Sequence, residues 1–277
     1  MKDLNLTIKN VFIYRKRNFV ALVLYFIFLI GLAFLLNYVP FLRDNSIWIV
    51  LILFVITFIL LIVYKSITKC DEDELLKLGI NLCIISAVIQ LIFYSYSGIS
   101  IGASGFMFLF SQLIYAIYTV FITGFPIIGL IHIIYSKTRI WIMGTSAIIG
   151  IIAQYISMYY LSINPLLGNW SLNLTIVFLS CIQGILLFYA YLYLKNFVKC
   201  VAWKIFLAYG LVLSLLDFIY RYFETLNTHG YIPFNLTSVL LIESGVILFY
   251  VIIGVFFQLL YKNKLFSQDS KYWNKRQ

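Results

Sequence analysis

Eight apolar runs, each long enough to cross a bilayer, constrain this chain more than any other feature of its sequence. A transmembrane helix needs about 20 mostly apolar residues to cross about 30 Å of hydrocarbon. The runs are Phe19–Val39, Ile47–Tyr64, Leu78–Ser97, Phe106–Tyr135, Ile140–Ile163, Asn173–Leu194, Ile205–Phe223 and Leu236–Leu260. The sequence therefore predicts an all-α, polytopic membrane bundle of about eight transmembrane helices, which forms a single domain over residues 1–277. Seven or nine spans also fit the pattern.

The composition supports a membrane protein. Of the 277 residues, 63% are hydrophobic and only 11% are charged, whereas a soluble chain of this length covers its surface with more polar side chains. A net charge of +10 would suggest nucleic acid as a partner of a soluble protein. Here the basic residues lie in short segments between apolar runs, so we expect membrane lipids as partners and no nucleic acid.

The distribution of Lys and Arg predicts the orientation of the bundle. Cytoplasmic loops of membrane proteins carry an excess of these residues. With the N-terminus inside, eighteen of the twenty fall in cytoplasmic segments, and only Arg43 and Arg221 lie toward the outer side. The sequence therefore predicts a multi-pass protein of the cell membrane with both termini in the cytoplasm. The first run has no cleavage site of small residues after it, so we expect it to be a retained span.

This orientation places three unusual residues in the outer half of the bilayer. Cys181 lies roughly 12 Å below the outer surface, Arg221 within a turn of that surface, and Glu243 about seven residues into the last span. Charged groups in a span are costly and usually face the bundle interior. Three glutamines of earlier spans share this half: Gln90, Gln112 and Gln154. Together they predict an outward-facing polar cavity.

The chemistry of these residues allows a catalytic and a structural interpretation. A thiol becomes a nucleophile when a positive neighbour stabilises the thiolate, and Arg221 on the next span is a candidate for that neighbour of Cys181. Cysteine is also a common small apolar filler in packed helices. Arg221 has a local partner in Asp217, one turn earlier, so it can alternatively be an interfacial arginine that reaches the headgroups.

A histidine and a glutamate complete the candidate set. His229 is expected in the outer loop before the last span, where it can act as a general acid or base if the loop covers Cys181. Glu243 is either a proton acceptor or the counter-charge of Arg221. The two histidines of the chain lie at opposite faces of the membrane, so no metal site and no other cofactor are expected.

The last hundred residues contain a cysteine on the predicted outward side in the sequence CIQG, an apolar run that ends in YAYLYLKN, a basic loop, and an arginine about forty residues after the cysteine. This arrangement resembles the exosortase/archaeosortase family. Members of that family are multi-spanning, transpeptidase-like enzymes that process C-terminal sorting signals of exported proteins. In this chain the glycine is displaced by one position, and no basic residue stands inside the last span.

The resemblance implies roles for particular residues. Cys181 would attack a substrate carbonyl and form a thioester, while Arg221 and His229 would stabilise charge or move protons. Gln183, Asp217 and Glu243 would contact the substrate, an exported protein with a C-terminal transmembrane signal. The alternative is a non-enzymatic carrier or sensor, whose outward polar pocket binds a small anionic or lipid-like ligand through Arg221 and the glutamines. In that case Cys181 serves packing only.

Overall fold

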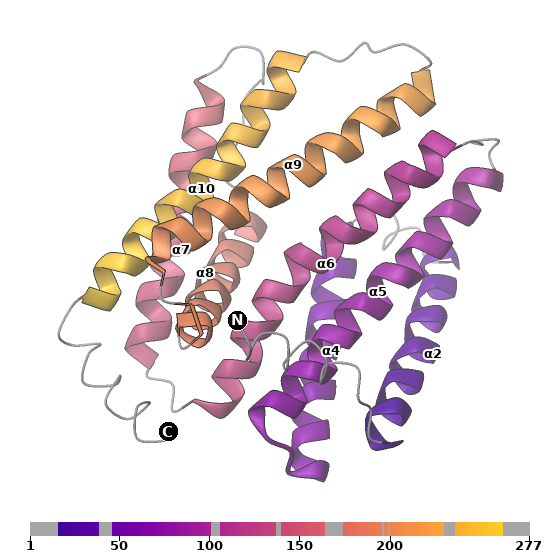
Figure 1. The fold of residues 1–277 in the computed structure, drawn as a ribbon, viewed down its shortest axis with the longest axis horizontal. Coiled ribbons are helices and arrows are strands. Elements are labelled where there is room, and N and C mark those ends of the chain that lie inside the picture. Colours follow the sequence, from indigo (N-terminus) through magenta and orange to yellow (C-terminus); the bar gives the residue numbers. More distant parts are fainter. Residues whose placement is uncertain are drawn as a thin grey trace.

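The computed structural model describes residues 16–38, 46–100, 106–136, 140–163, 174–195, 197–198, 200–229 and 236–262. In these ranges all regular structure is helical (Figure 1). The helices are α2 (Lys16–Tyr38), α4 (Ser46–Thr68), α5 (Glu72–Ser100), α6 (Phe106–Tyr135), α7 (Ile140–Ser162), α8 (Leu174–Lys195), α9 (Ala202–His229) and α10 (Leu236–Lys262). Each predicted run coincides with one helix, so the all-α prediction is confirmed.

Two helices extend beyond the apolar runs that predicted them. Helix α5 begins at Glu72 instead of Leu78, because Asp71 caps it by accepting the Glu74 N–H at 2.8 Å and acidic residues of its first turn suit the helix dipole. Helix α9 continues past Phe223 to His229. The prediction of an outer loop at His229 is therefore wrong for the backbone, and its side chain lies outside the described residues.

Five helices contain a segment long and apolar enough to cross a membrane. The segments are Phe106–Tyr135, Ile140–Ser162, Ile176–Lys195, Ala202–Leu226 and Thr237–Tyr261. Large apolar side chains are also exposed in stripes, for example Leu109, Leu113, Ile117 and Phe121 at every fourth position of α6. Residues four apart share one helix face, and a water-soluble protein rarely exposes continuous apolar faces of this extent. The chain is thus a membrane protein with transmembrane helices.

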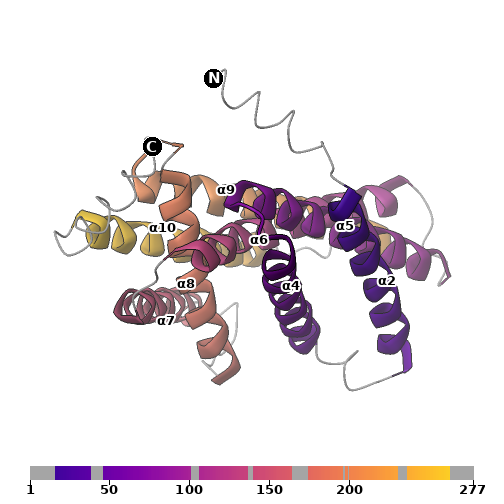
Figure 2. The ribbon, with the colours of Figure 1, turned by 90° about the horizontal axis from the view of Figure 1, so that it is seen from below.

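Five of the helices close into a ring (Figures 1 and 2). Each member packs against the next in the order α6, α8, α7, α10, α9, and α9 packs against α6 again. Helix α5 packs on the outer side of α6, and α2 and α4 pack on this flank. Helix α6 therefore belongs to both the ring and the flank, and joins the two parts of the bundle.

Aromatic side chains fill the centre of the ring. The Phe188 and Phe257 rings meet edge to face with centroids 4.9 Å apart, and Phe206 lies 5.5 Å from Phe257. All three side chains are fully buried. Edge-to-face pairs of this kind stabilise packing beyond the area that they bury. A second apolar core lies between α2, α4, α5 and α6.

Small residues bring α7 and α8 into direct backbone contact. Ser146 and Gly150 are four residues apart on α7, and Ser180 and Gly184 have the same spacing on α8. A Cβ atom added at Gly150 would overlap the Ser180 carbonyl oxygen, and one added at Gly184 would overlap that of Ser146. This small-xxx-small spacing is typical of close helix pairs in membranes.

One end of the bundle carries the basic side chains. At this end the Lys65 Nζ donates to the Ile134 carbonyl at 2.7 Å, and the His132 Nδ1 lies 2.7 Å from the Glu72 Oε1. These contacts join the C-terminal ends of α4 and α6 to the start of α5. The start of α9 is tied to α10 by the Ala202 N–H and the Gln258 amide oxygen at 2.8 Å. We call this side the basic end, since Lys65, Lys69, Lys77, Lys195 and Lys204 all lie there.

Candidate functional site

The part of α9 that lies away from the basic end carries a charged pair. The Arg221 Nε donates to the Asp217 Oδ2 at 2.6 Å, across one helical turn. The Arg221 side chain is 47% exposed, whereas Asp217 is 16% exposed. The spacing of four residues places both side chains on one face of the helix. The local partner that the sequence predicted for Arg221 is therefore present.

Glu243 faces this pair from α10. It is 5% exposed, and neither of its carboxyl oxygens has a hydrogen-bond partner among the described residues. Its charged neighbours are Asp217 and Arg221. The Ser214 hydroxyl donates to the Glu243 backbone carbonyl at 3.3 Å, and so joins α9 to α10. We call Ser214, Asp217, Arg221 and Glu243 the outer polar cluster.

The charges of this cluster do not balance when all its groups are ionised. Two carboxylates face one guanidinium, and Asp217 already accepts the short hydrogen bond from Arg221. Burying a carboxylate that receives no hydrogen bond costs several kcal/mol by order of magnitude. Among the described residues no group of three His, Cys, Asp or Glu side chains is arranged to hold a metal ion.

Tyrosines connect the cluster to the centre of the ring. Tyr118 of α6 interacts electrostatically with Asp217 and Glu243, and it also lies near Tyr250. Tyr250 accepts a hydrogen bond from the Gln183 Nε2 at 3.2 Å. The ring centroids of Tyr250 and Tyr209 are 4.9 Å apart. The cluster therefore continues inward as a row of phenols, and Gln183 reaches this row and not the charged pair.

These tyrosines could not be singled out from the sequence. The chain has 22 tyrosines, and aromatic residues are common at bilayer interfaces, so their number gave no reason to single out Tyr118, Tyr209 or Tyr250. Their positions in the middle of apolar runs were the available signal, because a phenol in a span needs a polar partner. The Tyr209 hydroxyl finds one in the Phe121 carbonyl at 3.0 Å.

Cys181 lies on α8. Its thiol is free and partly exposed. The charged neighbours of Arg221 are Asp217 and Glu243. Helix α8 packs mainly against α6 and α7, whereas α9 packs against α6 and α10. The pairing of Cys181 with Arg221 stays a prediction.

Two glutamines of the predicted polar layer are also described. Gln112 is buried on α6, and Gln154 is partly buried on α7. The side chain of Gln90 lies outside the described residues. Buried polar side chains therefore occur on at least three helices of the ring, since Ser157 of α7 and Glu243 of α10 are buried as well as Gln112 of α6.

The chain matches no family model, no curated protein and no solved structure. The resemblance of its last hundred residues to the exosortase/archaeosortase family stays a prediction.

Proposed function

We propose that this chain crosses the cell membrane eight times and has both termini in the cytoplasm. The proposal is supported by eight helices that coincide with the eight apolar runs. It is also supported by the grouping of Lys65, Lys69, Lys77, Lys195 and Lys204 at one end of the bundle, opposite Arg221. Such a charge bias orients membrane proteins with the basic end in the cytoplasm. The outer polar cluster then lies toward the extracytoplasmic surface.

Within this topology the protein is a non-enzymatic carrier or sensor that takes up a proton at Glu243. The observation that carries this proposal is a carboxyl group that is 5% exposed and has no hydrogen-bond partner among the described residues. A buried carboxyl of this kind is neutralised by a proton or by an approaching cation. The cluster lacks one positive charge, and the proton is the smallest group that supplies it.

The same charge count argues against the anionic ligand that the sequence suggested. Asp217 occupies the Nε side of the Arg221 guanidinium at 2.6 Å, and Glu243 contributes a second carboxylate. An added anion would meet two negative groups and a single positive one. Like charges at short range raise the free energy of binding, so the cluster favours a proton or a small cation.

The arrangement of the cluster gives the proton a route to Glu243 and couples its uptake to the packing of two helices. Arg221 is half exposed at the outer end of α9, which leaves the charged pair accessible from that side. Tyr118 and Tyr250 extend the polar groups toward the centre of the ring. Protonation of Glu243 removes its charge from the α9–α10 interface, so the packing of these two helices depends on the protonation state.

Replacement of Glu243 by glutamine tests this proposal. We expect infrared difference spectra of the full chain in lipid nanodiscs, recorded above about pH 6 where exposed carboxyl groups stay ionised, to contain the C=O stretching band of a protonated carboxylic acid as the pH is lowered. Glu243→Gln should remove this band and one bound proton per chain, because glutamine keeps the shape of the side chain and cannot titrate.

A matched control uses the other carboxylate on the same side of the bundle. Glu224 lies on the exposed face of α9 and accepts a hydrogen bond from the Tyr220 hydroxyl at 2.9 Å. Glu224→Gln should leave the band unchanged. A band that persists in Glu243→Gln, or a wild-type protein without one, would refute proton uptake at Glu243.

An exosortase-like cysteine transpeptidase is the second candidate. It is favoured by the accessibility of Cys181, which is partly exposed while Cys70 and Cys83 are buried. In this mechanism the Cys181 thiolate attacks a peptide carbonyl of an exported protein near its C-terminal transmembrane signal. The peptide C–N bond breaks, the C-terminal signal leaves as an amine that takes up a proton, and the resulting thioester is resolved by an amine or another acceptor. Arg221 and His229 would stabilise the developing charge, and Gln183, Asp217 and Glu243 would bind the substrate.

Cys181→Ser separates the two candidates. An enzyme should lose processing of an exported protein with a C-terminal apolar tail and a basic end, because the hydroxyl is a far weaker nucleophile than the thiolate. A carrier or sensor should keep its proton uptake in the same variant. The exposed Cys200 supplies the control variant Cys200→Ser. Processing that survives in Cys181→Ser would exclude the enzyme, whereas its loss in Cys181→Ser alone would support it.

A further inference from the structure

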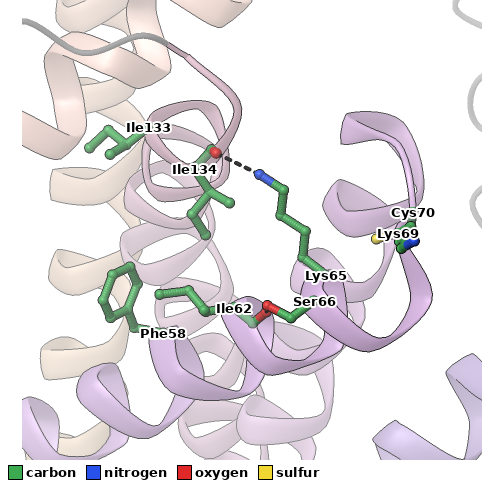
Figure 3. A pocket seen from close by; sticks show the side chains of 8 residues that line it. All are labelled: Phe58, Ile62, Lys65, Ser66, Lys69, Cys70, Ile133 and Ile134. Atoms are coloured by element: carbon green, nitrogen blue, oxygen red, sulfur yellow. Dashed lines mark hydrogen bonds between the residues drawn. The ribbon is translucent and has the colours of Figure 1, made fainter.

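A pocket of about 660 Å³ opens at the basic end, between α4 and α6 (Figure 3). Phe58 and Ile62 of α4 and Ile133 and Ile134 of α6 form its apolar wall. Lys65 and Lys69 also line this pocket. Two lysines and an apolar wall in one pocket match an amphiphilic anion better than a purely polar one.

Lys65 is fixed in position by its neighbours. Its Nζ donates to the Ile134 carbonyl at 2.7 Å, as Figure 3 shows, and lies 4.0 Å from the centroid of the Tyr135 ring. A lysine ammonium has three N–H donors, and the carbonyl takes one of them. The charge therefore stays at the pocket while donors remain for a ligand.

Lys69 occupies a backbone conformation that disfavours a side chain. Its φ is 50°, in the left-handed region that favours glycine, and its N–H donates to the Lys65 carbonyl at 2.9 Å to end α4. Glycine is the usual residue at such a position. The Lys69 side chain is exposed, and its ammonium has no acidic partner among the described residues. The chain thus retains an unpaired cation at a site where glycine would be less strained.

We propose that this pocket binds an anionic phospholipid of the cytoplasmic leaflet. The phosphate group contacts the Lys65 and Lys69 ammonium groups, and an acyl chain lies along Phe58 and Ile62. The site rests on the proposed topology, which places the basic end at the cytoplasmic interface, where basic pockets between transmembrane helices bind anionic headgroups. The exposed apolar side chains of Ile59 and Val63 continue from the pocket along α4, so the acyl chain remains in contact with apolar surface.

A free phosphate ion would use the lysines but not the apolar wall. Phe58, Ile62, Ile133 and Ile134 supply half of the residues that line the pocket, and burial of apolar surface stabilises only a ligand that has apolar surface of its own. The geometry therefore favours a lipid over the free ion, and the experiment has an arm for each.

Lys69→Gly tests the proposal because it should weaken lipid binding while it keeps or raises the thermal stability of the fold. Native mass spectrometry of the full chain, with phosphatidylglycerol or phosphatidylcholine of the same acyl chains, measures retained lipid. We expect Lys69→Gly to weaken phosphatidylglycerol binding about fivefold, because each lysine near an anionic surface contributes on the order of a factor of five. Phosphatidylcholine binding should not change. The Tm should hold or rise, since glycine adopts this φ without strain.

Two further variants complete the design. Lys69→Arg keeps the charge and should retain phosphatidylglycerol. Lys204→Gln removes an exposed lysine at the same end of the bundle but outside the pocket, and should leave binding unchanged. Equal losses in Lys69→Gly and Lys204→Gln, or equal retention of both lipids by the wild type, would overturn the site. Displacement of phosphatidylglycerol by inorganic phosphate would assign the pocket to the free ion instead.

Discussion

Alanine in place of Gly150 should destabilise the bundle. The added Cβ would overlap the Ser180 carbonyl oxygen of α8, and a backbone atom cannot turn aside as the end of a flexible side chain can. Overpacking a well-packed interface costs about 1–3 kcal/mol and occasionally more. Alanine gains only about 1 kcal/mol over glycine in helix propensity. We expect the Tm in detergent micelles to fall by about 5 °C or more.

Gly144→Ala is the matched control for this prediction. Gly144 lies on the same helix, and a Cβ added there meets nothing within 4 Å. The propensity gain is the same at both positions, so Gly144→Ala should hold or raise the Tm. Gly184→Ala approaches the same interface from α8 and should behave like Gly150→Ala. Equal Tm values for Gly144→Ala and Gly150→Ala would contradict the close packing of α7 and α8.

The helices themselves could be predicted because length and apolarity decide them locally. An apolar run of about 20 residues can satisfy its backbone in hydrocarbon only as a helix, so the eight runs located eight helices. The Asp217–Arg221 pair also follows from sequence spacing alone, since residues four apart share a helix face. The ends of α5 and α9 were misjudged because capping and pairing of charged side chains extend a helix beyond its apolar part.

The neighbours of each helix could not be predicted in the same way. Cys181 and Arg221 are expected to meet because α8 and α9 are consecutive in the chain and antiparallel, and this pairing stays a prediction. Helix α8 makes close backbone approaches to α7, through Gly150 and Gly184, and to α6, through Gly129. Its contact with α9 includes the Tyr191 and Phe206 rings, whose centroids are 6.3 Å apart. The small residues can be found in the sequence. The helix against which each of them packs depends on how all five helices of the ring are arranged.

The state of Glu243 depends on the same long-range packing. From the sequence, Glu243 is expected to be either a proton acceptor or the counter-charge of Arg221. The groups of α9 that surround its carboxyl decide between these two roles. The three-dimensional arrangement is needed to show that Glu243 lies beside the Asp217–Arg221 pair and that its carboxyl receives no hydrogen bond from the described residues. A buried polar group without a donor is rare in folded proteins, which makes this residue the best indication of function in the bundle.

Leucine in place of Glu243 should therefore stabilise the fold while it removes proton uptake. The carboxyl is 5% exposed and unpartnered, so the variant no longer has to bury a polar group that lacks hydrogen bonds. That burial costs about 1–3 kcal/mol, and leucine has a similar volume. We expect a Tm higher by several degrees in detergent micelles, together with the loss of the carboxylic acid band in infrared spectra.

Asp217→Leu should have the opposite effect on stability, although it also removes one carboxylate from the outer polar cluster. Asp217 holds the Arg221 guanidinium at 2.6 Å, and its loss leaves that cation without its partner in the pair, which is destabilising when the group is half buried. The two substitutions should change the Tm in opposite directions, because the Asp217 carboxylate is paired with Arg221 and the Glu243 carboxyl has no hydrogen-bond partner among the described residues. If Glu243→Leu lowers the Tm as Asp217→Leu does, Glu243 is a structural counter-charge of Arg221, and the proposed role in proton uptake fails with it.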